Sequence, residues 1–304
     1  MLYAFIALII GCTVYTHYRG KVRHKFSRQL SDHSTFMGPI NCFMYAFSAV
    51  KNEPYANLEQ FPELKQFKDN WETIRAEAIA LASGGEIKAS EKYDDAGFNS
   101  FFRQGWKRFY LKWYGDYHDS AKKLCPETCK MIESVPSIKA AMFTQLAPGS
   151  TLVKHRDPYA GSLRYHLGII TPNDDQCAID VDGVEYSWRD GEDVLFDETY
   201  IHYAYNNTDK DRIIFFCDVE RPMRGKFAQW VNHTVGNIFL AAAAAPNSDS
   251  DRTGFINKAF KYIYAVRRVG KSMKAWNRRV YYLVKWLLFG GIAALLILAY
   301  IKIF

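Results

Sequence analysis

The feature that most constrains the fold is a series of short strand-like segments in the second half of the chain. They cover residues 140–146, 150–157, 163–172, 177–182, 184–190, 192–197, 201–206 and 212–220. Turn-forming pairs such as Pro148-Gly149, Asp182-Gly183 and Asn206-Asn207 separate them. Strands that alternate with turns at this spacing are typical of an all-β sandwich or barrel. We therefore expect a jelly roll over about 140–222, with two facing sheets and a pocket between them.

Helical and aromatic segments precede the strands. Apolar residues recur at steps of three and four within 57–93, which predicts a helix that Gly84-Gly85 ends. Residues 122–134 predict a second, short helix that contains Cys125 and Cys129. A lone pair of cysteines at this spacing is weak support for a metal site, and their role stays open. The aromatic-rich stretch 98–118 is expected to lie in the core rather than to form a ligand cage.

Both ends of the chain are apolar. Residues 286–304 are interrupted only by Lys302, and a helix of that length spans about 28 Å, close to the hydrocarbon thickness of a bilayer. We expect a transmembrane helix there and a transmembrane anchor over 1–18. A cleaved signal peptide is the alternative for 1–18, but its basic residues would precede the apolar run. Here they follow it, from Arg19 onward.

The net charge of +7 is unevenly distributed. Residues 1–30 contain five Lys and Arg and residues 252–304 contain eleven, with no acid in either segment. The remaining 23 bases lie among all 32 acids, so 31–251 has a net charge of −9. Nucleic-acid modules carry their basic surface on the folded domain, so no nucleic-acid partner is expected. Bases beside both apolar ends predict a central domain on the cytoplasmic side, with reduced cysteines.

These patterns divide the chain into six parts. After the anchor, 19–56 is a basic juxtamembrane and connecting segment, and 57–240 is the main domain. Residues 241–254 resemble a linker, and 255–285 form a basic amphipathic helix before the last apolar segment. Two interpretations of this amphipathic helix stay open. It lies on an anionic membrane leaflet, or it packs on the domain with a solvated charged face.

Three side chains suggest a metal site on the strands. His155 and Asp157 stand two positions apart, and side chains at that spacing share one face of an extended strand. His202 lies on a later segment. Two histidines and one carboxylate form the facial triad of non-haem Fe(II) oxygenases, which leaves coordination positions open.

Basic residues accompany the proposed triad. Arg164 and His166 alternate onto one face of their strand. A hairpin centred on Asn207 would place Arg212 opposite His202. An arginine near a metal suits a dicarboxylate ligand, because its planar fork binds a carboxylate through two hydrogen bonds. The alternative is an ordinary strand arginine that pairs with an acid such as Asp218.

Residues 105–222 resemble the aspartyl/asparaginyl β-hydroxylase family of Fe(II)/2-oxoglutarate oxygenases. The resemblance rests on GWKRFYLKWYG, TQLAPGSTLVKH, LRYHLGIITP and VLFDETYIHYAYNNTDKDRIIFFCDVERP. Several spacings also match at once, among them Thr144 to His155 and His202 to Arg212. Within the family, HRDPYAGSLRYHLGIITPN and the apolar ends look most like the bacterial lipid A 2-hydroxylases.

The resemblance implies a double-stranded β-helix with flanking helices and assigns roles to the candidate residues. His155, Asp157 and His202 would hold Fe(II) and form the catalytic centre. Arg212 and the hydroxyl of Thr144 would bind the far carboxylate of 2-oxoglutarate, while Arg164 and His166 would contact the carboxylate near the metal. Thr144 stands where the animal protein hydroxylases have Ser, and Asp157 stands where they have Gly.

The implied activity is an O2-dependent hydroxylation that converts 2-oxoglutarate to succinate and CO2. The expected substrate is C2 of a secondary acyl chain of lipid A, met at the cytoplasmic face of the bacterial inner membrane. No obligate protein partner is evident. A protein aspartyl/asparaginyl β-hydroxylase and a non-enzymatic jelly-roll binding protein are the alternatives. Acyl length, oligomeric state and the bases that would contact a lipid head group stay open.

Overall fold

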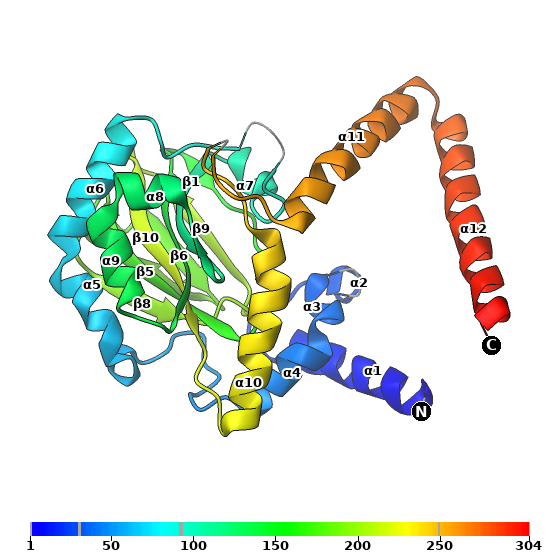
Figure 1. The fold of residues 1–304 in the computed structure, drawn as a ribbon, viewed down its shortest axis with the longest axis horizontal. Coiled ribbons are helices and arrows are strands. Elements are labelled where there is room, and N and C mark those ends of the chain that lie inside the picture. The colour runs from blue at the N-terminus through cyan, green and yellow to red at the C-terminus, as the bar shows by residue number, and fades with distance from the viewer. Residues whose placement is uncertain (1, 30–31, 91–93, 249, 304) are drawn as a thin grey trace.

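Two facing β-sheets form the centre of the molecule. The computed structural model describes residues 2–29, 32–90, 94–248 and 250–303 (Figure 1). One sheet has six strands in the order β2-β1-β3-β10-β5-β8, and the other has four in the order β4-β9-β6-β7. The strands are β1 (Trp106–Trp113), β2 (Asp116–Tyr117), β3 (Ile138–Leu146), β4 (Ser150–Thr151), β5 (Ser162–Ile170), β6 (Cys177–Val181), β7 (Val184–Ser187), β8 (Asp193–Phe196), β9 (His202–Asn206) and β10 (Arg212–Glu220). The mainly β jelly roll predicted from the turns is therefore confirmed.

The predicted strand segments match the observed strands with one large difference. The segment 150–157 forms only the two-residue strand β4, followed by a single bridge from His155 to His202. Two further strands, β1 and β2, come from the aromatic-rich stretch, where Trp106 and Tyr110 are buried between the sheets as core residues. All six cysteines are free.

Helices cover the outer face of the six-stranded sheet (Figure 1). They are η1 (Leu58–Gln60), η2 (Pro62–Leu64), α5 (Lys65–Asp69), α6 (Trp71–Ser83), α8 (Asp119–Leu124) and α9 (Pro126–Glu133). A further short helix, α7 (Asn99–Phe102), lies beside β1. The predicted helix before Gly84 is thus interrupted at Asn70, whose side chain donates to the carbonyl of Gln66 (2.8 Å) and caps α5. The second predicted helix is divided at Pro126, which cannot donate to the preceding turn and starts α9 instead.

Cys125 and Cys129 lie in the core under these helices. Both thiols are buried and contact the outer face of the sheet. Burial raises the pKa of both, that of Cys129 to about 12. Such protonated, enclosed thiols behave as small apolar side chains.

The N-terminal part packs against one end of the jelly roll. Its helices are α1 (Leu2–Tyr18), α2 (Phe26–Gln29), α3 (His33–Phe36) and α4 (Gly38–Ala46). Arg19, which the sequence assigned to a basic juxtamembrane segment, is instead buried and paired with Asp197. Its guanidinium lies between the rings of Tyr45 and Tyr200, 3.9 Å from each centroid. This base is therefore part of the domain's packing.

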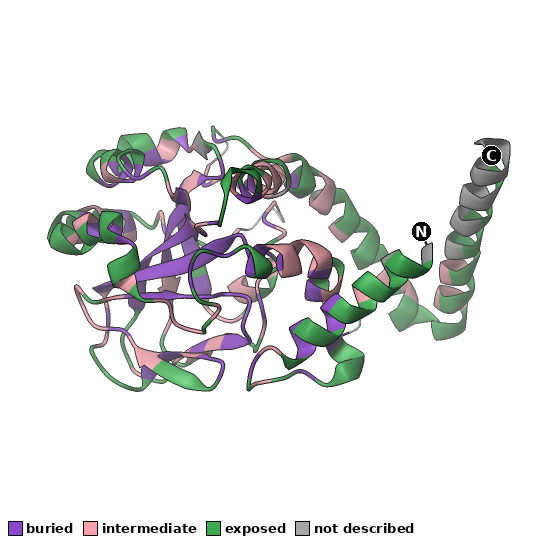
Figure 2. Cartoon of the chain, turned by 90° about the horizontal axis from the view of Figure 1, so that it is seen from below, coloured by how far each residue is buried: buried purple, intermediate pink, exposed green. Residues whose placement is uncertain are grey.

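The C-terminal part begins with α10 (Lys226–Val235), a short π-helix, η3 (Gly236–Leu240), and a 3-10 helix, η4 (Ala241–Ala243). Residues 241–254, which resemble a linker in sequence, pack on the domain. Asn247 accepts from the backbone N–H of Tyr110 (2.7 Å), and Asp251 accepts from the hydroxyl of Ser120 (2.7 Å). Then follow α11 (Phe255–Trp276) and α12 (Arg278–Ile303), which extend away from the sheets (Figure 2).

The two transmembrane helices predicted over 1–18 and 286–304 are not supported. Both segments lie in helices, α1 and α12. In the part of the chain that the structure describes, however, no helix combines enough length with enough apolar character to cross a bilayer.

Candidate metal centre

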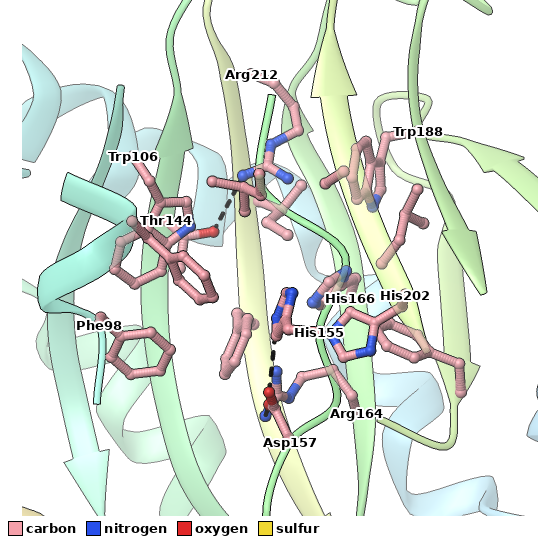
Figure 3. A pocket seen from close by; sticks show the side chains of 17 residues that line it. Phe98, Trp106, Thr144, His155, Asp157, Arg164, His166, Trp188, His202 and Arg212 are labelled. Atoms are coloured by element: carbon pink, nitrogen blue, oxygen red, sulfur yellow. Dashed lines mark hydrogen bonds and ion pairs between the residues drawn. The ribbon is translucent and has the colours of Figure 1, made fainter. Parts of the chain in front are cut away.

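The pocket between the two sheets contains every residue that the sequence proposed for the site. Strand alternation places Arg164, His166 and Arg212 there, because the odd-numbered residues of β5 and β10 pack under the helices and the even-numbered ones face the smaller sheet. The pocket region holds about 470 Å³ of space between protein atoms, part of it open to solvent. Its polar lining is Thr144, His155, Asp157, Arg164, His166, His202 and Arg212, and the other ten lining residues are apolar or aromatic (Figure 3).

His155, Asp157 and His202 meet at one point in this pocket. One ligand atom of each lies within 4.8 Å of the others. The two histidines are joined by a backbone bridge, in which each N–H donates to the other's carbonyl, at 3.0 and 2.9 Å. Residues 47 positions apart are therefore direct neighbours. The fold thus brings the three side chains of the proposed triad together.

Hydrogen bonds fix the orientation of both imidazoles. Nδ1 of His155 lies 2.7 Å from the carbonyl of Val153, and Nδ1 of His202 lies 3.0 Å from that of Tyr200. A carbonyl only accepts, so each Nδ1 carries the proton and each Nε2 keeps a free lone pair. A backbone carbonyl behind a ligating imidazole is the usual way to hold a metal-binding tautomer.

The charge states also suit a divalent metal. Burial lowers the pKa of both histidines, that of His202 to about 3, so both rings are neutral near pH 7. Burial opposes ionisation of Asp157, but the Arg164 guanidinium and the two imidazoles outweigh it and lower its pKa to about 2. Two neutral imidazoles and one carboxylate are the donor set of a facial-triad iron site, and the residues present fit such an ion.

Arg212 is the most unusual charged side chain of the pocket. It is 2 % exposed, and its Nη2 donates to the hydroxyl of Thr144 (3.3 Å). Its Nε has no hydrogen-bond partner, and within the described residues no carboxylate pairs with it. Burial lowers its pKa to about 10, which still leaves it charged. Burying a cation without a paired anion costs free energy, and an anionic ligand bound beside Arg212 would offset that cost.

The predicted hairpin between His202 and Arg212 is wrong. Arg212 pairs with Leu146 on β3, whereas His202 pairs with Val181 on β6. The chain crosses from one sheet to the other after Asn206, so the two residues face each other across the pocket. Figure 3 shows Arg212 and Thr144 at one end of the pocket and the triad nearer the other.

Arg164 is paired with carboxyl groups of the protein itself. Its Nη2 donates to Asp157 (2.8 Å) and contacts Glu198, while its Nε donates to Asp218 (2.8 Å). Asp218 is the cross-strand partner of Arg164 on β10, so it is not available to Arg212. Arg164 therefore holds a member of the triad in place, and three carboxyl groups already surround the guanidinium expected to bind a ligand.

His166 stays a candidate for ligand contact. The ring is buried, and neither nitrogen has a hydrogen-bond partner. It lies among the rings of Trp188, Phe196 and Phe216. Burial first, and then the nearby Arg164 and Arg212 charges, lower its pKa well below the ordinary value. A neutral imidazole here keeps one N–H donor for a bound acceptor.

Several site residues were not found from the sequence. Glu198 accepts from Ser162 (2.8 Å), and its backbone carbonyl accepts from the N–H of Asp157 (2.9 Å). Trp188 stacks on Arg212, with the guanidinium carbon 4.4 Å from the ring centroid. Phe101, from the stretch expected to be core, lies 4.7 Å from the ring of His155 between centroids. Only Asp218 was named from the sequence, as a possible partner of Arg212, whereas in the structure it pairs with Arg164.

Comparisons with known proteins identify the family of the chain. The family model for aspartyl/asparaginyl beta-hydroxylase matches residues 68–222, about half of the chain. The chain belongs to this family. The predicted family assignment is therefore confirmed. The family is one of hydroxylases, which supports an oxygenase activity for this chain.

Relatives within the family differ in substrate. The chain is 32% identical over 196 residues to an ornithine lipid ester-linked acyl 2-hydroxylase of Rhizobium tropici, covering 64% of this chain and 69% of that one. It is 27% identical over 190 residues to the human aspartyl/asparaginyl beta-hydroxylase, covering 59% of this chain but only 24% of that one. Among solved structures, a Pseudomonas putida prolyl-4-hydroxylase aligns with a TM-score of 0.34 at 15% identity, over 51% of this chain and 88% of that chain.

Proposed function

We propose that the protein is an Fe(II)- and 2-oxoglutarate-dependent dioxygenase that hydroxylates C2 of an ester-linked acyl chain of a membrane lipid. The observation that carries the proposal is the buried, unpaired Arg212 in the same pocket as His155, Asp157 and His202. A metal-binding triad and a separate cationic anchor suit a ligand that is both chelating and anionic.

The cosubstrate would span the pocket between these two groups. Arg212 and Thr144 would bind its far carboxylate, with Trp188 stacked behind the guanidinium. His166 would donate to its metal-side carboxylate. Arg164 would act on Asp157 rather than on the cosubstrate. When bound, Fe(II) with 2-oxoglutarate and O2 supplies the oxidising power needed for an unactivated C–H bond, and the protein positions the target carbon.

The lining of the pocket favours an acyl substrate. Its seven polar side chains are all accounted for by the triad, by Arg164 and by cosubstrate binding. The remaining lining is apolar, and Phe98 and Phe101 from the α7 region lie on the partly exposed side. A substrate aspartate or asparagine would need polar partners beyond these, whereas an acyl chain needs only apolar surface. The pocket thus supports a lipid over a protein substrate.

Two lipids are candidates. Lipid A follows from the resemblance of HRDPYAGSLRYHLGIITPN to lipid A 2-hydroxylases, and the action would then take place at the bacterial inner membrane. An ornithine lipid is the second candidate, because a relative with that activity covers most of this chain. The proposed cytoplasmic orientation no longer has the support of two spanning helices.

Mass spectrometry of extracted lipids tests this function. Cells that express the protein should gain one oxygen atom on an acyl chain of lipid A, and His155→Ala should abolish the gain because it removes a metal ligand. A gain on ornithine lipid alone would select the second substrate. Purified protein that forms no succinate from 2-oxoglutarate with Fe(II), or that hydroxylates peptides instead, would contradict the proposal.

A further inference from the structure

The helix α11 carries an apolar stripe that no part of the described protein covers. Phe255, Tyr262, Val266, Val269 and Trp276 recur at steps of seven, four, three and seven, which places them on one face. Their exposed fractions are 78, 74, 73, 61 and 78% respectively. Large apolar side chains exposed in a row usually mark an interaction surface.

The other side of α11 attaches to the domain beside the pocket. Asn257 is fully buried, and its Nδ2 donates to the carbonyls of Ala243 (2.8 Å) and Ala244 (2.9 Å). Its Oδ1 accepts from the N–H of Ala96 (2.7 Å), two residues before the pocket-lining Phe98. Asn257 is two positions from Phe255, or about 200° around the helix, so the attachment and the apolar stripe lie on opposite faces.

The start of the helix is held just as closely. The N–H of Gly254 donates to the carbonyl of Ala244 (2.8 Å), and a Cβ at Gly254 would lie 2.3 Å from the carbonyl oxygen of Ala242. Any other residue here would push the helix off the domain. The packing thus fixes the direction in which α11 leaves the domain near α7 (Figure 1).

The charge around the stripe selects the kind of partner. Residues 252–304 contain eleven Lys and Arg and no acid. Within α11, Arg267, Arg268, Lys271 and Lys274 lie off the apolar stripe. An apolar stripe beside a continuous positive surface is complementary to a bilayer with anionic head groups, where each base adds up to about 1 kcal/mol of attraction. The α11 of a second copy carries the same charges and would repel it.

We propose that α11 is an interfacial helix that docks the protein on an anionic lipid bilayer, with its apolar stripe in the head-group region. The Asn257 attachment then places the pocket rim at Phe98 beside the membrane surface. The docking itself stands on the exposed stripe and the charge. Its purpose, to bring the pocket to an acyl chain, rests on the proposed function.

Vesicle co-sedimentation of the full chain tests the docking. Binding should be at least about 10-fold stronger to vesicles of phosphatidylglycerol and phosphatidylcholine than to phosphatidylcholine alone, and high salt should weaken it. Ile263→Asp, on the edge of the stripe, should weaken binding by at least about 10-fold, since it puts a charge in place of an exposed apolar side chain that would enter the membrane. Ile79→Asp is the matched control, because Ile79 is also exposed on a helix, α6, across the molecule from α11.

The results separate the two proposals. The docking would be overturned by equal binding to both vesicle types, or by an equal loss of vesicle binding in Ile263→Asp and Ile79→Asp. It would also be overturned if the protein bound no vesicles and instead formed a dimer that Ile263→Asp disrupts. Vesicle binding by a protein that modifies no lipid would leave the docking in place and contradict the proposed function. If Ile263→Asp left the hydroxylation of lipid in vesicles unchanged, the docking would not serve the proposed function.

Discussion

At the scale of single residues, the neighbours of each charged group decide what it does. Arg164 and Arg212 both line the pocket and both come from central strands of the six-stranded sheet. Arg164 contacts three carboxyl groups, whereas Arg212 contacts a hydroxyl and an aromatic ring. One guanidinium is therefore neutralised within the protein, and the other is left for a ligand.

This difference predicts the effect of changing Arg164. Arg164→Lys should lower the affinity of the triad for Mn(II) by about 10–100-fold, because Asp157 loses the fork that orients it. Isothermal titration of metal into the purified variant measures this. Arg75→Lys on α6, outside the pocket, is the control. An unchanged metal affinity with a raised KM for 2-oxoglutarate would show instead that Arg164 binds the cosubstrate.

At the scale of elements, the short helix α7 connects the pocket to the surface. Phe98, which immediately precedes α7, stacks on Trp106, with ring centroids 4.7 Å apart, and Phe101 lies against His155. The loop before α7 is fixed by Asp95, which accepts from the N–H of Phe98 (3.2 Å) and pairs with Arg108 (3.0 Å). The aromatic rim is therefore held rigidly beside the metal centre.

Shortening this rim should affect the substrate rather than the cosubstrate. Phe101→Ala removes apolar surface worth about 2 kcal/mol, so kcat/KM for the acyl substrate should fall by about 10–100-fold. Succinate formation without lipid should stay near the wild-type rate, since Arg212 and Thr144 are untouched. Parallel assays of lipid hydroxylation and of succinate measure both. An equal fall in the two rates would mean that Phe101 supports the metal centre.

At the scale of the whole molecule, one buried carboxylate joins three distant parts of the chain. Asp197, after β8, pairs with Arg19 from the N-terminal part and with Arg221 after β10 (2.7 Å). Burial opposes its ionisation, but the two arginines outweigh it and hold the pKa of Asp197 far below its ordinary value. The N-terminal helices are thereby attached to the jelly roll through a charge.

This arrangement predicts acid sensitivity. A carboxyl whose pKa is lower in the folded state stabilises the fold fully above its unfolded pKa, about 3.9, and progressively less as pH falls below it. Asp197→Asn should cost about 3–5 kcal/mol at pH 7, because two buried arginines lose their partner, and about nothing at very low pH. Urea unfolding of wild type and variant at a series of pH values from 7 downward measures this difference in stability. A constant difference between wild type and variant at all pH values would contradict the ion-pair explanation.

Local sequence patterns determined most of the β architecture and the identity of the site. Alternation of apolar residues and turn pairs is a short-range property, so the strands and their inward faces could be predicted from neighbouring residues alone. The same alternation brought Thr144, Arg164, His166 and Arg212 to one face. The spacing of His155, Asp157 and His202 suggested a metal triad, the family resemblance assigned Fe(II) to it, and the structure brings the three side chains together.

Tertiary structure alone decided the partners across space. The crossing after Asn206 separates His202 and Arg212 into different sheets, because β9 pairs with β4 and β6 whereas β10 pairs with β3 and β5. Glu198 and Asp218 capture Arg164, and Asp197 captures Arg19, through contacts between distant segments that no local pattern encodes. Burial then makes such pairing decisive, since a charge removed from water must meet an opposite charge or await a ligand.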